Sequence, residues 1–177
     1  KVPKMEQYDH QDYIFQFIFF KSIIEFSNIR EQAISDDFKK YTDEVLDGFN
    51  INDVDNCGND EERYISIFQE YNKNFIKKYE YIFENYLVNY MYNNLFPFTE
   101  SDDMLDGYIM LVVRYSFIRF YLVGRYISSR QESSENIIKL ISLFARDIEH
   151  DKTYMSEIYD YIEKNQYDNM NFANKLL

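Results

Sequence analysis

The sequence predicts a single all-α domain of about six helices in a bundle-like arrangement over residues 1–177. Only four glycines and two prolines interrupt the chain, so long helices meet few breaking residues. Apolar side chains recur every three or four residues through most of its length, which is the period of a helix with a buried face. No stretch alternates apolar and polar residues as a half-buried strand does.

The first helix is expected at residues 9–29. Tyr13, Phe17, Phe20 and Ile24 follow one another at helical spacing. Further apolar residues between them widen the buried face almost all round, which is typical of a helix at the centre of a core.

The second helix is expected at residues 34–47, where apolar side chains from Ile34 to Val45 keep the same spacing. Gly48 follows as a candidate C′ residue, the position that favours glycine after a helix end. The polar stretch at 49–60, rich in Asn and Asp, is expected to be a loop.

The third and longest helix is expected at residues 61–94, because aromatic and aliphatic residues step by threes and fours from Tyr64 to Tyr90. Pro97 disfavours a helical conformation of the residue before it, so the helix should end near that proline.

The rest of the chain predicts further helices, the first of them at about residues 103–130 and capped by Ser101 or Asp102. The remaining elements are a fifth helix opened by Ser133 and Ser134 and ending near His150, a sixth from Asp151 or Lys152 to about Asn165, and a last turn or short helix within Tyr167–Leu177.

The composition indicates an acidic protein with a large core. Hydrophobic residues make up 46% of the chain, and the formal net charge is −12. Lys and Arg are scattered rather than clustered, so no basic patch is available for a nucleic acid, and we expect no nucleic-acid partner. An acidic surface suits a basic partner instead.

Cysteine usage and the apolar segments favour a cytoplasmic protein. Cys57 is the only cysteine, which excludes an intramolecular disulfide and any Cys-based zinc or iron–sulfur site within the chain. The first residues lack the apolar core of a signal peptide. The most apolar stretch, 108–127, contains three arginines, so we expect no membrane span.

Two short patterns touch on metal binding without predicting it. The segment Asp53–Gly58 begins like an EF-hand loop, but Cys57 and Tyr64 replace the ligands at its fifth and twelfth positions, so a solvated loop is favoured over calcium. His10 and His150 are the only histidines, and a metal site would need both. A metal-dependent helical enzyme is an alternative that bound metal in the purified protein would reveal.

Arg119 is the first candidate functional residue. At about 100° per residue it falls in the middle of an apolar face of the predicted fourth helix, which also carries Tyr108, Val112, Tyr115, Leu122 and Tyr126. A guanidinium on such a face needs a carboxylate or carbonyl oxygens as partners. The favoured interpretation is that Arg119 extends its charged end to solvent (snorkels), stacks on tyrosine rings or makes one structural ion pair; ligand binding is the alternative.

The densest cluster of titratable groups lies in the segment 144–151. Arg146 and His150 are one turn apart, and Glu149 borders the apolar face closely enough to meet an arginine such as Arg119. The favoured interpretation is helix-end electrostatics, and the alternative makes His150 an acid or base steered by Glu149.

Three segments in order resemble the flagellin lysine-N-methylase family: Glu84–Phe98, Tyr108–Arg119 and Phe144–His150, with a Leu-Leu ending at Leu177. The resemblance covers roughly the last hundred residues well and the first eighty weakly. The matching positions are Glu84, Asn85, Tyr86, Asn89, Pro97, Arg114, Tyr115, Arg119, Arg146, Glu149 and His150.

The resemblance implies a bacterial cytoplasmic protein linked to methylation of flagellin lysines, with S-adenosylmethionine as the methyl donor. The family is similar in having an N-terminal cysteine cluster, which implies a metal or iron–sulfur centre. Only Cys57 is present here, so that centre would lie outside this chain. The chain is then a C-terminal portion of a longer protein or a divergent member, and whether it is catalytic alone stays open.

On this resemblance we hypothesise that Glu149 and Arg119 form a buried pair and that His150 and Asn89 line a cleft between the predicted third, fourth and fifth helices. Glu149 and His150 are the candidate proton acceptors from a lysine amine. The candidate substrate- or ligand-binding residues are Asn85, Tyr86, Asn89, Arg114, Tyr115, Arg119 and Arg146. The alternative function is a non-enzymatic helical module that binds a ligand or a partner.

Overall fold

The computed structural model describes residues 10–27, 35–50, 60–98, 102–149 and 152–177. Within these ranges it contains eight α-helices, two π-helical segments and no strand, which confirms the all-α class and exceeds the expected helix count. The elements are α1 (His10–Phe26), α3 (Asp36–Gly48), α4 (Asp60–Tyr71), η1 (Asn72–Ile76), α5 (Glu80–Asn93), α6 (Met104–Ser129), α7 (Ser134–Phe144), η2 (Ala145–Glu149), α8 (Lys152–Lys164) and α9 (Met170–Leu176).

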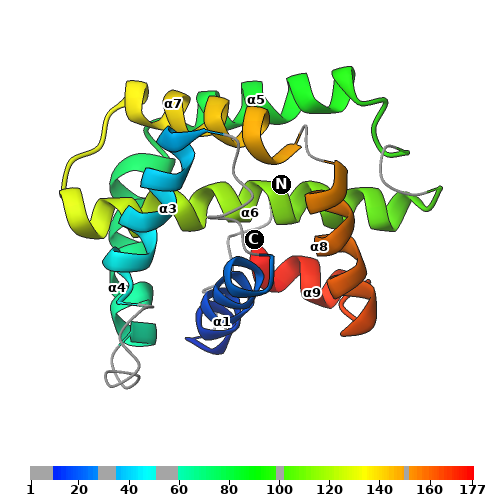
Figure 1. The fold of residues 1–177 in the computed structure, drawn as a ribbon, viewed down its shortest axis with the longest axis horizontal. Coiled ribbons are helices and arrows are strands. Elements are labelled where there is room, and N and C mark those ends of the chain that lie inside the picture. Colours follow the sequence, from blue (N-terminus) through cyan, green and yellow to red (C-terminus); the bar gives the residue numbers. More distant parts are fainter. Residues whose placement is uncertain (1–9, 28–34, 51–59, 99–101, 150–151) are drawn as a thin grey trace, which may run out of the picture.

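Helix α6 forms the axis of the domain. Figure 1 shows α5 and α7 running along one side of it and α1 and α9 lying on the opposite side, while α3 and α4 cross its C-terminal end. In the described part of the chain, α6 alone is long and apolar enough to cross a membrane, and 83% of its most apolar window is buried inside the domain. Its apolar composition is therefore accounted for by the helices that enclose it.

Short polar side chains fix where several helices begin. The side chains of Ser35, Asp103, Ser133 and Asn169 each accept a hydrogen bond from a backbone N–H of the first turn, at α3, α6, α7 and α9. Ser133 confirms the predicted start of α7. The cap of α6 is Asp103 rather than Asp102, while Ser101 lies outside the described residues.

The predicted long helix at 61–94 is wrong, because the chain divides there into α4, η1 and α5. In η1 the Lys77 backbone N–H donates to the Asn72 carbonyl, five residues back, as a π-helical turn requires. Residues 77–79 form a turn, in which the Tyr79 backbone N–H donates to the Phe75 carbonyl, and α5 begins at Glu80 and runs along α6. Apolar residues keep their three- and four-residue spacing across the break, so the pattern did not reveal the change of direction.

Helices α3 and α6 cross in contact at a pair of glycines. A Cβ atom added at Gly48 would lie 2.3 Å from the Gly124 carbonyl oxygen, and one added at Gly124 would lie 2.8 Å from a methyl carbon of Val45. Gly48 is the last residue of α3 and has no positive φ, so the expectation that it is a C′ residue is wrong. Its missing side chain serves the close helix crossing instead.

Aromatic rings fill the core, as the composition predicts. Phe17, Phe49, Tyr64, Phe68 and Phe120 form a connected group of rings with centroids 4.8 to 6.2 Å apart. The hydroxyls of buried tyrosines find polar partners at the edge of this group, since Tyr64 donates to Gln16 and Tyr121 bonds Thr42.

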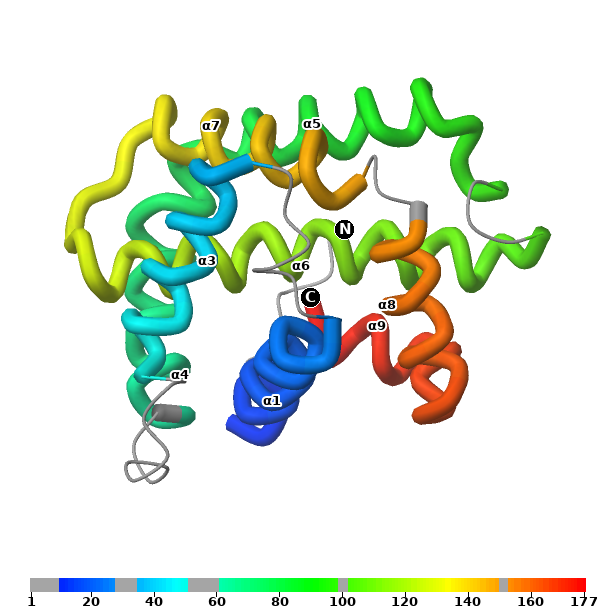
Figure 2. Tube along the Cα trace, viewed as in Figure 1, coloured from blue at the N-terminus to red at the C-terminus, as the bar shows by residue number. Residues whose placement is uncertain are grey.

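The end of α9 is tied to α1 and α6 through its backbone carbonyls. Gln16 on α1 donates to the Lys175 carbonyl at 2.7 Å, and Ser116 on α6 donates to the Leu176 carbonyl at 2.8 Å. Figure 2 shows the red end of the chain meeting α1 beneath α6. Carbonyls that have no partner within a helix are thereby satisfied by side chains of two other helices.

Candidate functional site

Those candidate site residues that the structure describes do not gather in one place. The structure separates them into a buried cluster around Glu149, a set of exposed residues, and a pocket that contains Tyr115 and Arg119. The three places differ in burial, in charge and in the ligands that they could bind.

The first place is a buried ion pair between α6 and η2. The Arg114 Nε lies 3.8 Å from the Glu149 Oε1, and the side chains are 2% and 12% exposed. Arg114 also donates from Nη1 to the Met110 carbonyl at 3.1 Å and places its guanidinium 4.7 Å from the centre of the Tyr90 ring. The Tyr86 hydroxyl donates a short hydrogen bond to Glu149.

These contacts keep Tyr86 neutral. Burial raises the pKa of its hydroxyl well above the ordinary value, and the negative charge and hydrogen bond of Glu149 raise it further. Glu149 is thereby held between a cation and a donor, an arrangement that favours a structural role over proton transfer to a ligand.

The hypothesised pairing of Glu149 with Arg119 is wrong, because Glu149 pairs with Arg114. Arg119 instead donates to the backbone carbonyl of Leu177 at 2.8 Å. Two residues five apart on a helix differ by about 140° in direction, so the two arginines face different neighbours.

The second set faces outward. Asn85 and Asn89 are exposed on α5, and the predicted cleft between Asn89 and His150 falls partly outside the described residues. Arg146 is exposed and pairs with Asp147 through a 2.8 Å contact, which raises the pKa of the guanidinium. His150 lies outside the described residues, as do Cys57 and the EF-hand-like segment.

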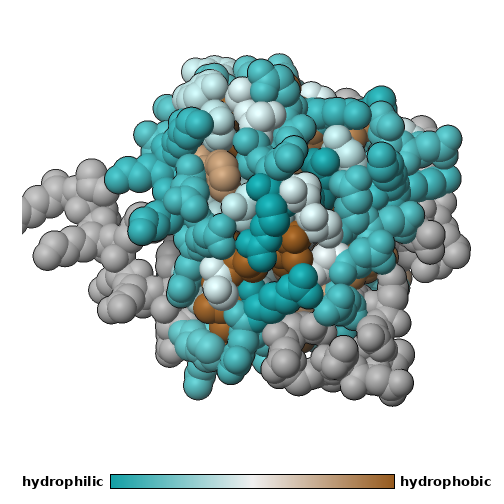
Figure 3. Space-filling view, turned by 90° about the vertical axis from the view of Figure 1, so that its left-hand side faces the viewer, coloured by the Kyte–Doolittle hydropathy of each residue, from teal (hydrophilic) through white to brown (hydrophobic). Residues whose placement is uncertain are grey.

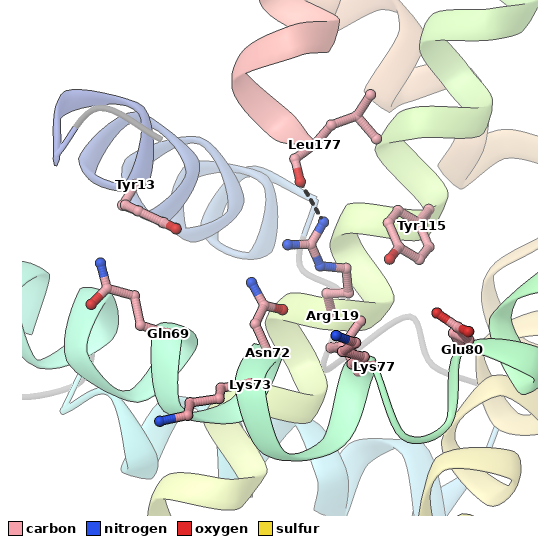
Figure 4. A pocket seen from close by; sticks show the side chains of 10 residues that line it. Tyr13, Gln69, Asn72, Lys73, Lys77, Glu80, Tyr115, Arg119 and Leu177 are labelled. Atoms are coloured by element: carbon pink, nitrogen blue, oxygen red, sulfur yellow. Dashed lines mark hydrogen bonds between the residues drawn. The ribbon is translucent and has the colours of Figure 1, made fainter. Parts of the chain in front are cut away.

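The third place is a pocket of about 690 Å³ between α1, α6 and the segment from α4 to α5. Its lining residues are Tyr13, Gln69, Asn72, Lys73, Ile76, Lys77, Glu80, Tyr115, Arg119 and Leu177. Figure 4 shows the Arg119 guanidinium reaching from α6 toward Leu177, with Asn72 and Lys77 projecting from the facing segment.

Arg119 is the buried charge of this pocket. Its side chain is 4% exposed, and its guanidinium lies over the rings of Phe68 and Tyr115, 4.7 and 5.1 Å from their centres. Nε has no hydrogen-bond partner among the described residues. The sequence therefore predicted correctly that Arg119 is buried on an apolar face against a tyrosine, and stacking satisfies part of its charge.

Among the side chains of the lining, three are cationic and one is a carboxylate, so their summed charge is positive within a chain of charge −12. Sequence reasoning missed Lys73 and Lys77, which stand four residues apart and border the pocket from the π-helical segment. The four-residue spacing of the two lysines, on the face that also carries Ile76, could have shown that they lie together. The irregular turn that presents them to the pocket could not have been predicted from the sequence. π-helical turns often occur where side chains serve a function.

Comparison with known proteins adds one finding. A profile of the family described as the FliB lysine N-methylase C-terminal domain matches residues 3–176, essentially the whole chain. No curated protein and no solved structure gives a significant match.

Proposed function

The chain belongs to the FliB lysine N-methylase C-terminal domain family, and on that premise we propose that it is the substrate-facing helical domain of a protein lysine N-methylase. Flagellin is the proposed substrate, S-adenosylmethionine the proposed methyl donor, and the cytoplasm the proposed location. The observation that carries this proposal is the family match over residues 3–176.

The charge of the domain supports the substrate-facing role. A protein of net charge −12 attracts lysine-bearing segments and steers their approach. Figure 3 shows mainly hydrophilic residues on the face that it presents.

Helix α5 offers the most specific surface for such a segment. The stretch 79–113 contains no Lys or Arg, and Glu84 is exposed on α5. Val88, Tyr92 and Leu95 are exposed near it, with 44%, 81% and 81% of their surfaces accessible. Apolar side chains beside a carboxylate, in a stretch of sequence without Lys or Arg, match a lysine-bearing amphipathic segment in both apolarity and charge.

The methyl donor fits the Arg119 pocket poorly. S-adenosylmethionine carries a sulfonium and an ammonium beside one carboxylate, and the charged side chains of the pocket are Arg119, Lys73, Lys77 and Glu80. Like charges would oppose binding there. We therefore assign no residue of this chain to the sulfonium.

The deciding experiment incubates the full-length protein with flagellin and S-adenosylmethionine labelled in its methyl group, with and without air. We expect label on flagellin lysines. Absence of transfer under both conditions would contradict the proposed reaction.

A surface variant separates the substrate-facing role from the reaction itself. Glu84→Lys reverses the charge beside the apolar residues of α5, so it should raise the KM for flagellin and leave kcat unchanged. Glu163→Lys makes the same change at an exposed site on α8 and serves as the control. Equal KM values for the two variants would contradict the proposal that flagellin binds at α5.

A second function, a non-enzymatic ligand-binding module, is favoured by one observation, the positive summed charge of the side chains that line the pocket around Arg119. Under this alternative the protein would bind a small molecule and transfer no methyl group. The labelling experiment above distinguishes the two.

A further inference from the structure

The pocket around Arg119 has the features of a binding site to which the proposed methylation reaction assigns no ligand. Its cations come from two elements: Arg119 from α6, and Lys73 and Lys77 from the segment that begins with η1. They stand around one cavity although the chain as a whole has a net charge of −12. Positive charge concentrated in a concave site attracts an anion.

Arg119 supplies the specific interaction. One of its terminal nitrogens is fixed by the Leu177 carbonyl, and the rings of Phe68 and Tyr115 hold the plane of the guanidinium. Figure 4 shows the other terminal nitrogen directed toward the space beside Tyr13 and Asn72. A guanidinium held in this way is already oriented to donate to an oxygen of a ligand.

The remaining lining defines the rest of the ligand. Ile76, Leu177 and the tyrosine rings give the pocket apolar walls, and the amides of Gln69 and Asn72 offer neutral polar contacts. Glu80 disfavours a second negative charge at its own end of the cavity. This combination fits one carboxylate attached to an apolar or aromatic body better than it fits an inorganic dianion.

We propose that this pocket binds a small molecule with one carboxylate on an apolar body, the carboxylate contacting Arg119 and attracted by Lys73 and Lys77. The proposal is independent of the methylase reaction, because it rests on the pocket alone.

The test titrates the purified protein with phenylacetate and hexanoate, and with the neutral amides phenylacetamide and hexanamide as matched controls. Binding is followed by isothermal titration calorimetry and by the NMR signal of the Arg119 guanidinium. We expect the carboxylates to bind about tenfold more tightly than their amides, which corresponds to one charge-assisted hydrogen bond. Equal binding of acids and amides would overturn the proposal.

Variants connect the binding to this pocket. Lys73→Gln and Lys77→Gln change exposed side chains, so the fold should be preserved while carboxylate affinity falls several-fold. Lys164→Gln, at an exposed site on α8, is the control and should leave affinity unchanged. Arg119→Lys keeps the charge and loses the planar donor group, so it should weaken binding further.

Two further titrations test whether other anions or the methyl donor bind in the same pocket. Inorganic phosphate should compete weakly with phenylacetate, and S-adenosylmethionine should not compete. Strong competition by phosphate would make the pocket a general anion site, and strong competition by S-adenosylmethionine would make it the donor site. Either result overturns the assignment to an apolar carboxylate.

Discussion

At the scale of single residues, α6 carries two buried arginines that are stabilised in different ways. Arg114 pairs with the carboxylate of Glu149, whereas Arg119 uses a backbone carbonyl and two aromatic rings. A buried guanidinium is tolerated only when such partners compensate for lost hydration. Removing the partner of either arginine therefore leaves a charge in the core.

The Arg114–Glu149 pair gives a prediction about stability. Glu149→Gln and Arg114→Met should each lower the free energy of unfolding by about 2 to 4 kcal/mol, because each leaves the opposite charge without its ion-pair partner. The double variant should lose less than the sum, with a coupling of about 1 to 3 kcal/mol. Urea denaturation of the four proteins measures this cycle.

A double-mutant cycle of Arg119 with Glu149 is the control. Arg119→Met and Glu149→Gln affect separate places in the structure, so their losses should add within about 0.5 kcal/mol. A larger coupling for Arg119 than for Arg114 would restore the pairing that the sequence predicted.

Sequence reasoning placed these residues only in part. The period of a helix correctly put Arg119 and Tyr115 on one buried face. It failed for Glu149, because the chain after Phe144 continues as a π-helix and the wider turn changes the direction of every later side chain. The partner of a buried charge depends on such small rotations, which residue spacing does not contain.

At the scale of elements, the close contact of α3 with α6 predicts that a Gly→Ala substitution lowers the stability of the domain, which is opposite to its usual effect in a helix. In most helices Gly→Ala stabilises by about 0.5 to 1 kcal/mol. At Gly124 the added methyl would meet the Phe49 ring at 2.7 Å and Val45 at 2.8 Å. Gly124→Ala should therefore destabilise the domain by about 1 to 3 kcal/mol, as overpacking does.

Thermal or urea unfolding checks the glycine prediction. Ser156→Ala, at an exposed position of α8, is the control and should change stability by no more than about 0.5 kcal/mol. A Gly124→Ala protein as stable as the original would show that the two helices can separate without loss.

Helix existence was the most predictable property of the elements. Caps such as Ser133 and an end marker such as Pro97 are local signals, and they placed the boundaries of α7 and α5 within a few residues. The division of the third predicted helix was not local. At the division, Tyr71 and Phe75 pack on Tyr126 of α6, with ring centres 5.5 and 5.2 Å apart, and such contacts between distant parts of the chain cannot be read from residue spacing.

At the scale of the whole molecule, the aromatic core predicts how stability responds to alkaline pH. Burial raises the pKa of hydroxyls on several core tyrosines, including Tyr64, Tyr71, Tyr121 and Tyr154. These groups stay neutral in the folded state, whereas tyrosines of the unfolded chain ionise near pH 10. The stability that comes from keeping these buried hydroxyls neutral is fully present below about pH 10, and it is lost as the pH rises above that value.

The expected slope is about 1.4 kcal/mol per pH unit for each such tyrosine. Absorbance at the phenolate band should show these hydroxyls ionising together with unfolding rather than before it. Tyr154→Phe removes one of them and should reduce the slope. Gradual ionisation of all tyrosines in a folded protein would contradict the burial.

The acidic surface predicts a dependence on salt. Binding of a lysine-rich flagellin peptide to the protein should weaken several-fold between about 50 and about 300 mM NaCl, because salt screens charges at the surface. Fluorescence anisotropy of a labelled peptide measures the affinity, and a peptide with glutamine at the lysine positions is the control. An affinity independent of salt would argue against electrostatic attraction.

The overall class of the fold was predictable from the sequence, but its centre was not. The all-round apolar pattern at 9–29 suggested that this first helix is central, yet Ile18 and Phe26 of α1 are 49% and 58% exposed. The enclosed helix is α6, whose three arginines argued against a membrane span and did not reveal its position. Tertiary packing decides which of two apolar helices is surrounded.

The attachment of α9 also governs the order of events during protein synthesis. Gln16 and Ser116 reach their carbonyl partners only when residues 175 and 176 are present. While the ribosome still covers α9, one flank of α6 and the inner side of α1 lack the contacts that α9 makes with them. The nascent chain can therefore close this side of its core only once α9 has emerged, and until then chaperones have an apolar surface to hold.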